Sequence, residues 1–184
     1  LPPGWAHDGI AVGECMTYSI GFRSPNGAQL AHEVLQRMAE GAADEEGAIY
    51  RDAQQPAVAG PGAIPAELQD FARQAVQRAL AQPQALECAL GEALTEPKPN
   101  VWFEPAEAGG MLECLTLDRR TRMMYDDKHV FINGESYRAS GRDATLMRRL
   151  ADERRLEPRD LVRASDEALE LLSAWCEAGW AHAR

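Results

Sequence analysis

Apolar residues recur at helical spacing in three stretches of the first half of the chain. After a turn at residues 24–26, apolar positions three and four apart predict a first helix. Asn26 is suited to its N-cap, Gln29 stands in the capping-box position, and Gly41 is expected to end it. Residues 42–62 are acidic and then rich in Ala, Pro and Gly, which predicts a long loop.

The second and third helices carry broad apolar faces. Pro65 is expected at the first helical position of the second helix, and Pro83 is expected to end it. The stripe of the second helix is broader than a helix exposed to water needs. Three amphipathic helices in a short span need more apolar cover than they provide for each other, and an ordinary helical core is one arrangement that would supply it. The apolar positions are Leu68, Phe71, Ala72, Ala75, Val76, Ala79 and Leu80 in the second helix, and Leu86, Ala89, Leu90, Ala93 and Leu94 in the third.

Beyond residue 110 the apolar period changes from that of a helix to that of a strand. Strands are predicted at 111–117, 122–125 and 130–132, and Asn133-Gly134 is a strong hairpin signal because a type I′ turn needs positive φ at both central residues. Ser140, with Asp143 three residues later, is expected to begin a helix, and Ser165 to cap the last one. Strands followed by three helices and a closing strand predict a small winged-helix-like domain.

The opening residues predict two strands of a different kind. Residues 9–12 and 15–22 read as strands joined by a tight connection at Gly13-Glu14. In the second strand, large apolar side chains alternate with the small polar Thr17 and Ser19. Before these strands, a Pro-Pro-Gly corner is followed closely by His7. A histidine in a turn is usually a surface residue, and small inward side chains also suit a narrow barrel without any ligand, so these residues alone leave both alternatives open.

The runs PPGWAHDG, TYSIGF and RSPN resemble the end of the catalytic barrel in bacterial ribosomal oxygenases of the JmjC type. The resemblance implies a cupin barrel that uses Fe(II) and 2-oxoglutarate to hydroxylate an arginine of a large-subunit ribosomal protein. In that family an H-x-D motif and a later histidine bind the iron, a set suited to non-haem iron. His7 matches the later histidine, whereas no H-x-D occurs in this chain. Thr17, where the family has Asn, and Ser19 would face 2-oxoglutarate.

The resemblance implies an α+β architecture in three parts. Residues 1–25 would end the cupin (double-stranded β-helix) barrel, residues 26–96 would form a helical dimerisation module, and residues 97–184 would form the winged-helix-like domain. A chain with one of three iron ligands is expected to be inactive alone and to bind neither cofactor, while serving dimerisation and substrate approach. The expected partners are a ribosomal protein substrate and a second copy of the chain.

Charge and cysteine content limit which partners and which cellular compartment are expected. The formal net charge of −10 is concentrated in residues 1–110, which carry 6 basic and 15 acidic side chains, against 13 and 14 in residues 111–184. Nucleic acid is therefore not an expected partner of the whole chain. The four cysteines are scattered, which fits a reducing cytoplasm, and no apolar run is long enough to predict a membrane span.

Two other classes of protein remain open on the sequence. A non-enzymatic winged-helix adaptor would use the arginine clusters at 119–122 and 148–155 to bind protein or nucleic acid. Neighbouring Asp and Glu residues nearly cancel those clusters, so a solvated helix face is the preferred interpretation. A cupin that stores metal or binds sugar would share the barrel but not the helical module.

Overall fold

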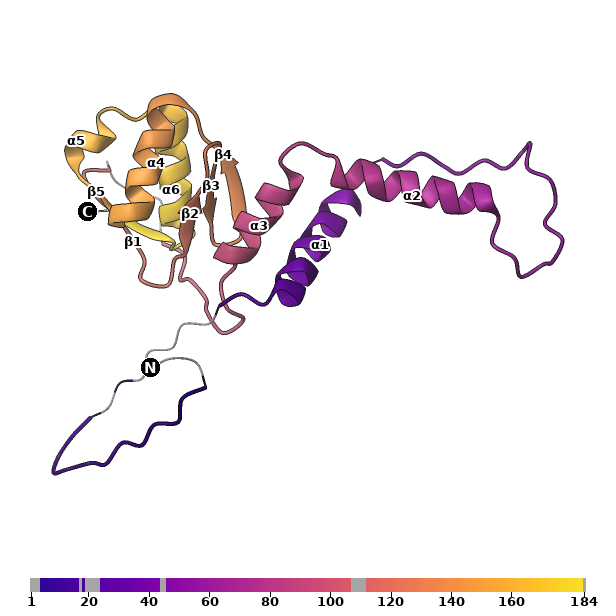
Figure 1. Cartoon of the computed structure of the whole chain (residues 1–184). Coiled ribbons are helices and arrows are strands. Elements are labelled where there is room, and N and C mark those ends of the chain that lie inside the picture. Colours follow the sequence, from indigo (N-terminus) through magenta and orange to yellow (C-terminus); the bar gives the residue numbers. More distant parts are fainter. Residues whose placement is uncertain (1–3, 17, 19–23, 44–45, 107–111, 184) are drawn as a thin grey trace.

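The computed structural model describes residues 4–16, 18, 24–43, 46–106 and 112–183. Three helices come first: α1 (Gly27–Ala43), α2 (Ala66–Leu80) and α3 (Ala85–Thr95). A mixed unit of short strands and three further helices follows, and α3 lies between it and the other two helices (Figure 1). The chain therefore has the predicted α+β composition.

The N-cap of α1 is the predicted one. The Oδ1 atom of Asn26 accepts hydrogen bonds from the backbone N–H groups of Ala28 (2.9 Å) and Gln29 (3.3 Å). The capping box is wrong, because the Gln29 side chain donates to Glu33 Oε1 at 2.9 Å instead. The predicted end is also wrong: Gly41 lacks the positive φ of a C-terminal glycine cap, and the helix continues to Ala43.

Helix α2 projects away from the rest of the chain and buries no residue (Figure 1). It begins at Ala66, one residue later than predicted, because Pro65 has the extended backbone of an N-cap residue (φ −58°, ψ 142°). One described contact of its apolar face is with the preceding loop, where the rings of Tyr50 and Phe71 lie 5.4 Å apart. Most of the predicted stripe is therefore open to water.

Helix α3 packs on α1 at one side and on the strands of a hairpin sheet at the other. Gly91 is buried against Phe131 so closely that a Cβ at this position would overlap the aromatic ring. The Oγ1 atom of Thr95 donates to the Gly91 carbonyl (2.8 Å) and accepts from the Gly134 N–H (3.1 Å). The Ser136 hydroxyl donates to Glu92 at 2.5 Å. These contacts fix α3 to the strands.

Two three-stranded antiparallel sheets form the second half of the chain. In one, β1 (Leu115–Leu117) lies between β5 (Arg155–Leu156) and β6 (Ala181–Ala183). The other is the meander β2 (Met123–Tyr125), β3 (His129–Ile132) and β4 (Glu135–Arg138). The hairpin turn is confirmed, since Asn133 and Gly134 both have positive φ (48° and 91°).

Helices α4 (Gly141–Glu153), α5 (Pro158–Leu161) and α6 (Asp166–Glu177) complete this unit. Ser165 caps α6 as predicted, since its Oγ accepts from the Ala168 N–H at 3.1 Å. Ser140 precedes α4 but makes no side-chain cap, and the Asp143 carboxylate accepts from the Ser165 N–H at 3.2 Å. Asp143 therefore joins the start of α4 to the start of α6, which local spacing does not reveal.

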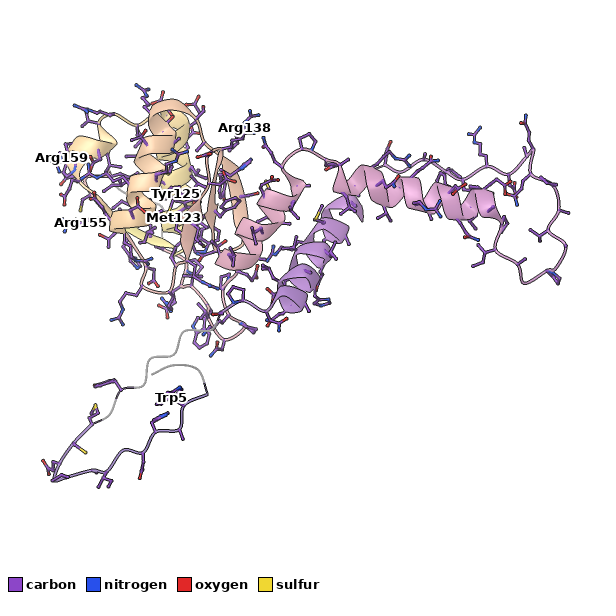
Figure 2. The ribbon with its side chains drawn as sticks, viewed as in Figure 1. Trp5, Met123, Tyr125, Arg138, Arg155 and Arg159 are labelled. Atoms are coloured by element: carbon purple, nitrogen blue, oxygen red, sulfur yellow. The ribbon has the colours of Figure 1, made fainter. Side chains whose placement is uncertain are left out.

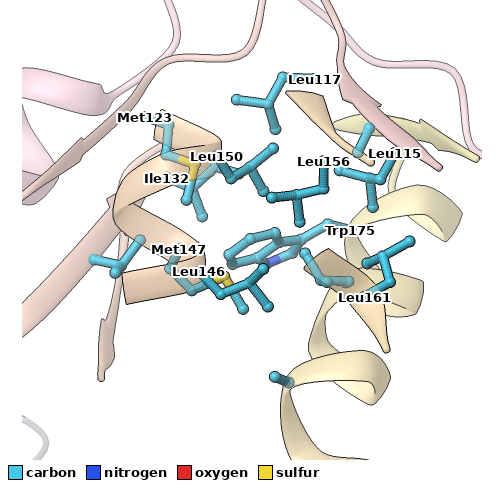
Figure 3. Packing of buried hydrophobic residues seen from close by; sticks show 14 residues of the cluster. Leu115, Leu117, Met123, Ile132, Leu146, Met147, Leu150, Leu156, Leu161 and Trp175 are labelled. Carbon is cyan, nitrogen blue, oxygen red and sulfur yellow. The ribbon is translucent and has the colours of Figure 1, made fainter. Parts of the chain in front are cut away.

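The hydrophobic core lies between the two sheets and the helices α4 and α6 (Figure 3). Trp175 of α6 is its largest side chain and is 2% exposed. The Trp175 ring packs edge-on against Tyr137 of β4, with centroids 5.5 Å apart. The other core members are Leu115, Leu117, Met123, Val130, Ile132, Leu146, Met147, Leu150, Leu156, Leu161, Ala168, Leu172 and Ala181.

The strand predicted at residues 9–12 is not formed. Residues 5–12 adopt neither helix nor strand, and Val12 is 87% exposed. The second predicted strand, 15–22, is described only at Cys15, Met16 and Tyr18, none of which is in a strand. The physical reason is that a strand requires a hydrogen-bonding neighbour, and both described sheets consist of other segments. The cupin strands of the predicted fold are thus absent from the described residues.

Candidate functional site

His7, the predicted iron ligand, lies exposed in a segment without helix or strand. The corner before it has the predicted conformation at Gly4, whose φ is +79°, and the connection at Gly13 has φ +75°. Thr17 and Ser19 lie outside the described residues. Within the residues that the structure describes, no three His, Cys, Asp or Glu side chains gather in a group that could hold a metal ion. These residues do not make an iron site by themselves, because a 2-His-1-carboxylate centre needs three ligands.

Histidines 32, 129 and 182 have the structural or exposed places expected of them. His32 is exposed on α1. His129 is buried in β3, where its Nδ1 lies 3.3 Å from Asp126 Oδ2. Hydrogen bonds from the backbone of Lys128 and His129, and from the His129 ring, hold the pKa of Asp126 below its usual value although partial burial opposes this. This pair fixes the turn before β3 and offers no open coordination site.

A charged network around Asp118 joins the end of β1 to β6. The Asp118 carboxylate accepts from Arg120 Nε (2.8 Å) and lies 3.1 Å from His182 Nε2. The Arg120 guanidinium, with the His182 ring, holds the pKa of Asp118 well below its usual range. Arg120 also donates to the Trp102 carbonyl at 3.0 Å, which attaches the linker before β1. Sequence reasoning missed this network, because residues 118 and 182 are far apart in the chain.

The arginines of the two predicted clusters mostly contact their own domain. Arg148 donates to the backbone carbonyls of Asp126 (3.1 Å) and Asp127 (2.8 Å), and Arg154 to those of Asp118 and Thr121. Arg149 donates to Asp160 Oδ1 at 2.7 Å and Arg155 pairs with Glu157 at 2.9 Å. The arginines are therefore not simply a solvated face, as the sequence suggested, and they do not form a free cationic surface either. Figure 2 places Arg155 and Arg159 on the outer side of the unit.

The apolar stripe of α2 is mostly exposed to water. Val76 and Leu80 are 59% and 50% exposed, and Ile64 before this helix and Leu86 after it are also exposed. A row of large apolar side chains on an isolated helix is unfavourable in water unless another surface covers it. Within the described residues, no helix is both long and apolar enough to cross a bilayer.

Comparisons with known proteins match both ends of the chain. The family model described as ROXA-like winged helix matches residues 78–182, which is more than half of the chain. The chain belongs to the ROXA-like winged-helix family. This family match begins before α3 and includes it, in agreement with the packing of α3 on β3 and β4. A second model, described as JmjC domain, matches residues 1–30.

This member of the ROXA-like winged-helix family also resembles individual known proteins. The ribosomal protein uL16 3-hydroxylase of Escherichia coli K12 is 31% identical over 111 residues, which are 58% of this chain and 28% of that protein. The crystal structure of the Escherichia coli ribosomal oxygenase YcfD has a TM-score of 0.65 at 21% identity, and covers 90% of this chain and 48% of its own. YcfD in complex with cobalt and 2-oxoglutarate has a TM-score of 0.64 at 20% identity, covering 89% and 47%.

The chain spans less than half the length of each of these relatives. At this identity the solved structures establish a shared fold. The predicted family resemblance and the winged-helix-like end are thereby confirmed.

Proposed function

We propose that this chain is the C-terminal portion of an Fe(II)- and 2-oxoglutarate-dependent oxygenase that hydroxylates an arginine of a large-subunit ribosomal protein. The observation that carries the proposal is the order of the two family matches, JmjC at 1–30 and ROXA-like winged helix at 78–182. The similarity to a uL16 3-hydroxylase supports the same substrate class.

In this proposal the opening segment completes a catalytic barrel. Its alternating residues 15–22 would pair with barrel strands, and His7 would supply one iron ligand. Thr17 and Ser19 would face 2-oxoglutarate, whose carboxylates accept hydrogen bonds from hydroxyl groups. Iron and 2-oxoglutarate would supply the oxidising chemistry in the whole protein. This chain alone, with no H-x-D motif, is expected to remain inactive.

The helical module would pair two copies of the protein. The support is the apolar stripe of α2, which lies exposed along a helix that projects from the remaining chain. A second copy of the same helix could cover the stripe in a symmetric arrangement, the commonest form of homodimer. The three predicted parts, 1–25, 26–96 and 97–184, stay a prediction, as does a cytoplasmic location. The adaptor alternative gains no support from the arginines, since most of them bind their own domain.

The experiment uses the full-length protein with Fe(II), 2-oxoglutarate and purified uL16. Mass spectrometry should find one added oxygen on an arginine of uL16, and His7→Ala should abolish the product. His32→Ala is the matched control, because His32 is an exposed histidine on α1, outside the segment that resembles the barrel. Full activity of His7→Ala would contradict the ligand assignment. Unmodified uL16 after reaction with wild-type protein would contradict the proposed function.

A further inference from the structure

Helix α6 follows the short helix α5 and has an unusual charge. In DNA-binding proteins a helix that enters the major groove lies beside phosphate groups. Here α6 has the sequence DEALELLSAWCE and carries Asp166, Glu167, Glu170 and Glu177 without any basic residue. The helix would therefore repel a phosphate backbone.

A groove runs along α6 at the edge of the core, and core residue Leu161 is part of its lining. A hollow of about 480 Å³ between α5 and α6 has an apolar floor that includes Pro158, Val162 and Leu169. It shares Leu169 and Ser173 with a second hollow of about 510 Å³ along α6. We call these two continuous hollows the α6 groove. Val162 is 85% exposed, so this floor presents apolar surface to water.

All charged side chains that line the α6 groove are acidic. Glu113 lines the first hollow, and Asp166, Glu170 and Glu177 line the second. Within the described residues, no hydrogen bond or ion pair engages the carboxylate of Glu170 or Glu177. The nearby basic residues Arg159 and Arg163 are exposed but do not line the groove (Arg159 in Figure 2). An apolar floor bordered by free carboxylates suits a segment that carries both apolar and cationic side chains.

We propose that the α6 groove docks a segment of the ribosomal-protein substrate in which Lys or Arg residues flank apolar side chains. This proposal rests on the proposed function, and it places substrate binding on the winged-helix unit as well as at the barrel. Ribosomal proteins bind RNA phosphates and are cationic, which matches the acidic border of the groove. A second copy of this chain is a poor occupant, because symmetric pairing would bring the same carboxylates together.

The test measures binding of fluorophore-labelled uL16 to the 184-residue chain by fluorescence anisotropy, at about 50 and about 300 mM salt. The Debye length is shorter at the higher salt concentration, so attraction between exposed charges is weaker there. Glu170→Lys with Glu177→Lys should weaken binding by about tenfold at the lower salt, and by clearly less at the higher salt. Val162→Ser should weaken binding at both salt concentrations. The matched control is Glu67→Lys with Glu87→Lys, which reverses two exposed charges on α2 and α3 and should change affinity by less than about twofold.

Equal losses in the groove variant and the control variant would overturn the docking surface, since they would reflect net charge alone. Binding of a DNA duplex as tight as that of uL16 would overturn it too. Circular dichroism and thermal unfolding confirm that each variant is folded. In the full-length protein the groove variant should raise the KM for uL16 and leave kcat unchanged. An unchanged KM would refute docking in the α6 groove and would not affect the proposed function. Failure of the wild-type protein to hydroxylate uL16 would refute the proposed function, and the anisotropy measurements would then be the test of docking in the groove.

Discussion

Replacing Gly91 by alanine tests how α3 is held on the hairpin sheet. Gly91 is buried in the middle of α3, and an added Cβ would overlap the ring of Phe131. Phe131 is itself buried, so its ring has little room to withdraw. The substitution therefore forces the helix away from β3 or moves the ring out of its packed position.

Two opposing terms set the magnitude. Overpacking a well-packed site costs about 1–3 kcal/mol. Alanine is favoured over glycine inside a helix by up to about 1 kcal/mol, which offsets part of that cost. Gly41 of α1 provides the matched control, because it is an exposed helical glycine whose added Cβ would meet nothing within 4 Å. Gly41→Ala should therefore stabilise the chain by a few tenths to about 1 kcal/mol.

The assay is urea unfolding of both variants and of the wild type, followed by tryptophan fluorescence, to which the buried Trp175 contributes. Gly91→Ala should be less stable than Gly41→Ala by about 1–3 kcal/mol. Adding Phe131→Leu should recover part of the loss in Gly91→Ala, although Phe131→Leu alone is destabilising, which is a coupling between neighbours. If Gly91→Ala stabilises the chain as much as Gly41→Ala does, the close approach of α3 to β3 is wrong.

Two further changes test the charged network and the helical module. Because Arg120 and His182 lower the pKa of Asp118, the unfolded chain binds a proton there at higher pH than the folded chain does. The stability from Asp118 is therefore complete above about pH 5 and is lost as pH falls toward the lowered pKa. Asp118→Asn should flatten the pH dependence of urea midpoints between about pH 5 and pH 2, and an unchanged slope would contradict the network. Val76→Asp should weaken self-association by about a hundredfold or more in sedimentation equilibrium, because it buries an unpaired charge in the proposed dimer. Gln77→Asp, on the opposite face of α2, should leave self-association unchanged. A wild-type chain that is monomeric at high concentration would contradict the dimer.

The order of elements in the second half was predictable from the sequence because its signals are local. Asn133-Gly134 determines a hairpin through backbone conformation, and Ser165 caps α6 with its own hydroxyl. Both signals act over a few residues, and both are confirmed. The Asp118–His182 contact and the Gly91–Phe131 contact join residues far apart in the chain, so no local pattern predicts them. A glycine inside a helical pattern does hint at close packing, but not at which residue it meets.

The capping predictions show how local signals can fail. A residue at the right spacing for a capping box forms one only if its side chain has no better partner. Gln29 has Glu33 one turn along α1, and Asp143 has the N–H of Ser165, the N-cap residue of α6. Spacing identifies candidates for a hydrogen bond, whereas competition among partners decides which bond forms.

The opening segment shows the corresponding limit for strands and for the candidate site. Alternation of side chains states which face of a strand would be buried, but a strand forms only where a neighbour accepts and donates its backbone hydrogen bonds. Residues 9–12 lack such a neighbour among the described residues, and His7 likewise lacks the two further ligands that iron needs. Both deficits occur within the stretch that matches the JmjC domain. Under the proposed function one barrel would remedy both, so pairing of this segment and iron binding by His7 should appear together in the full-length protein or fail together.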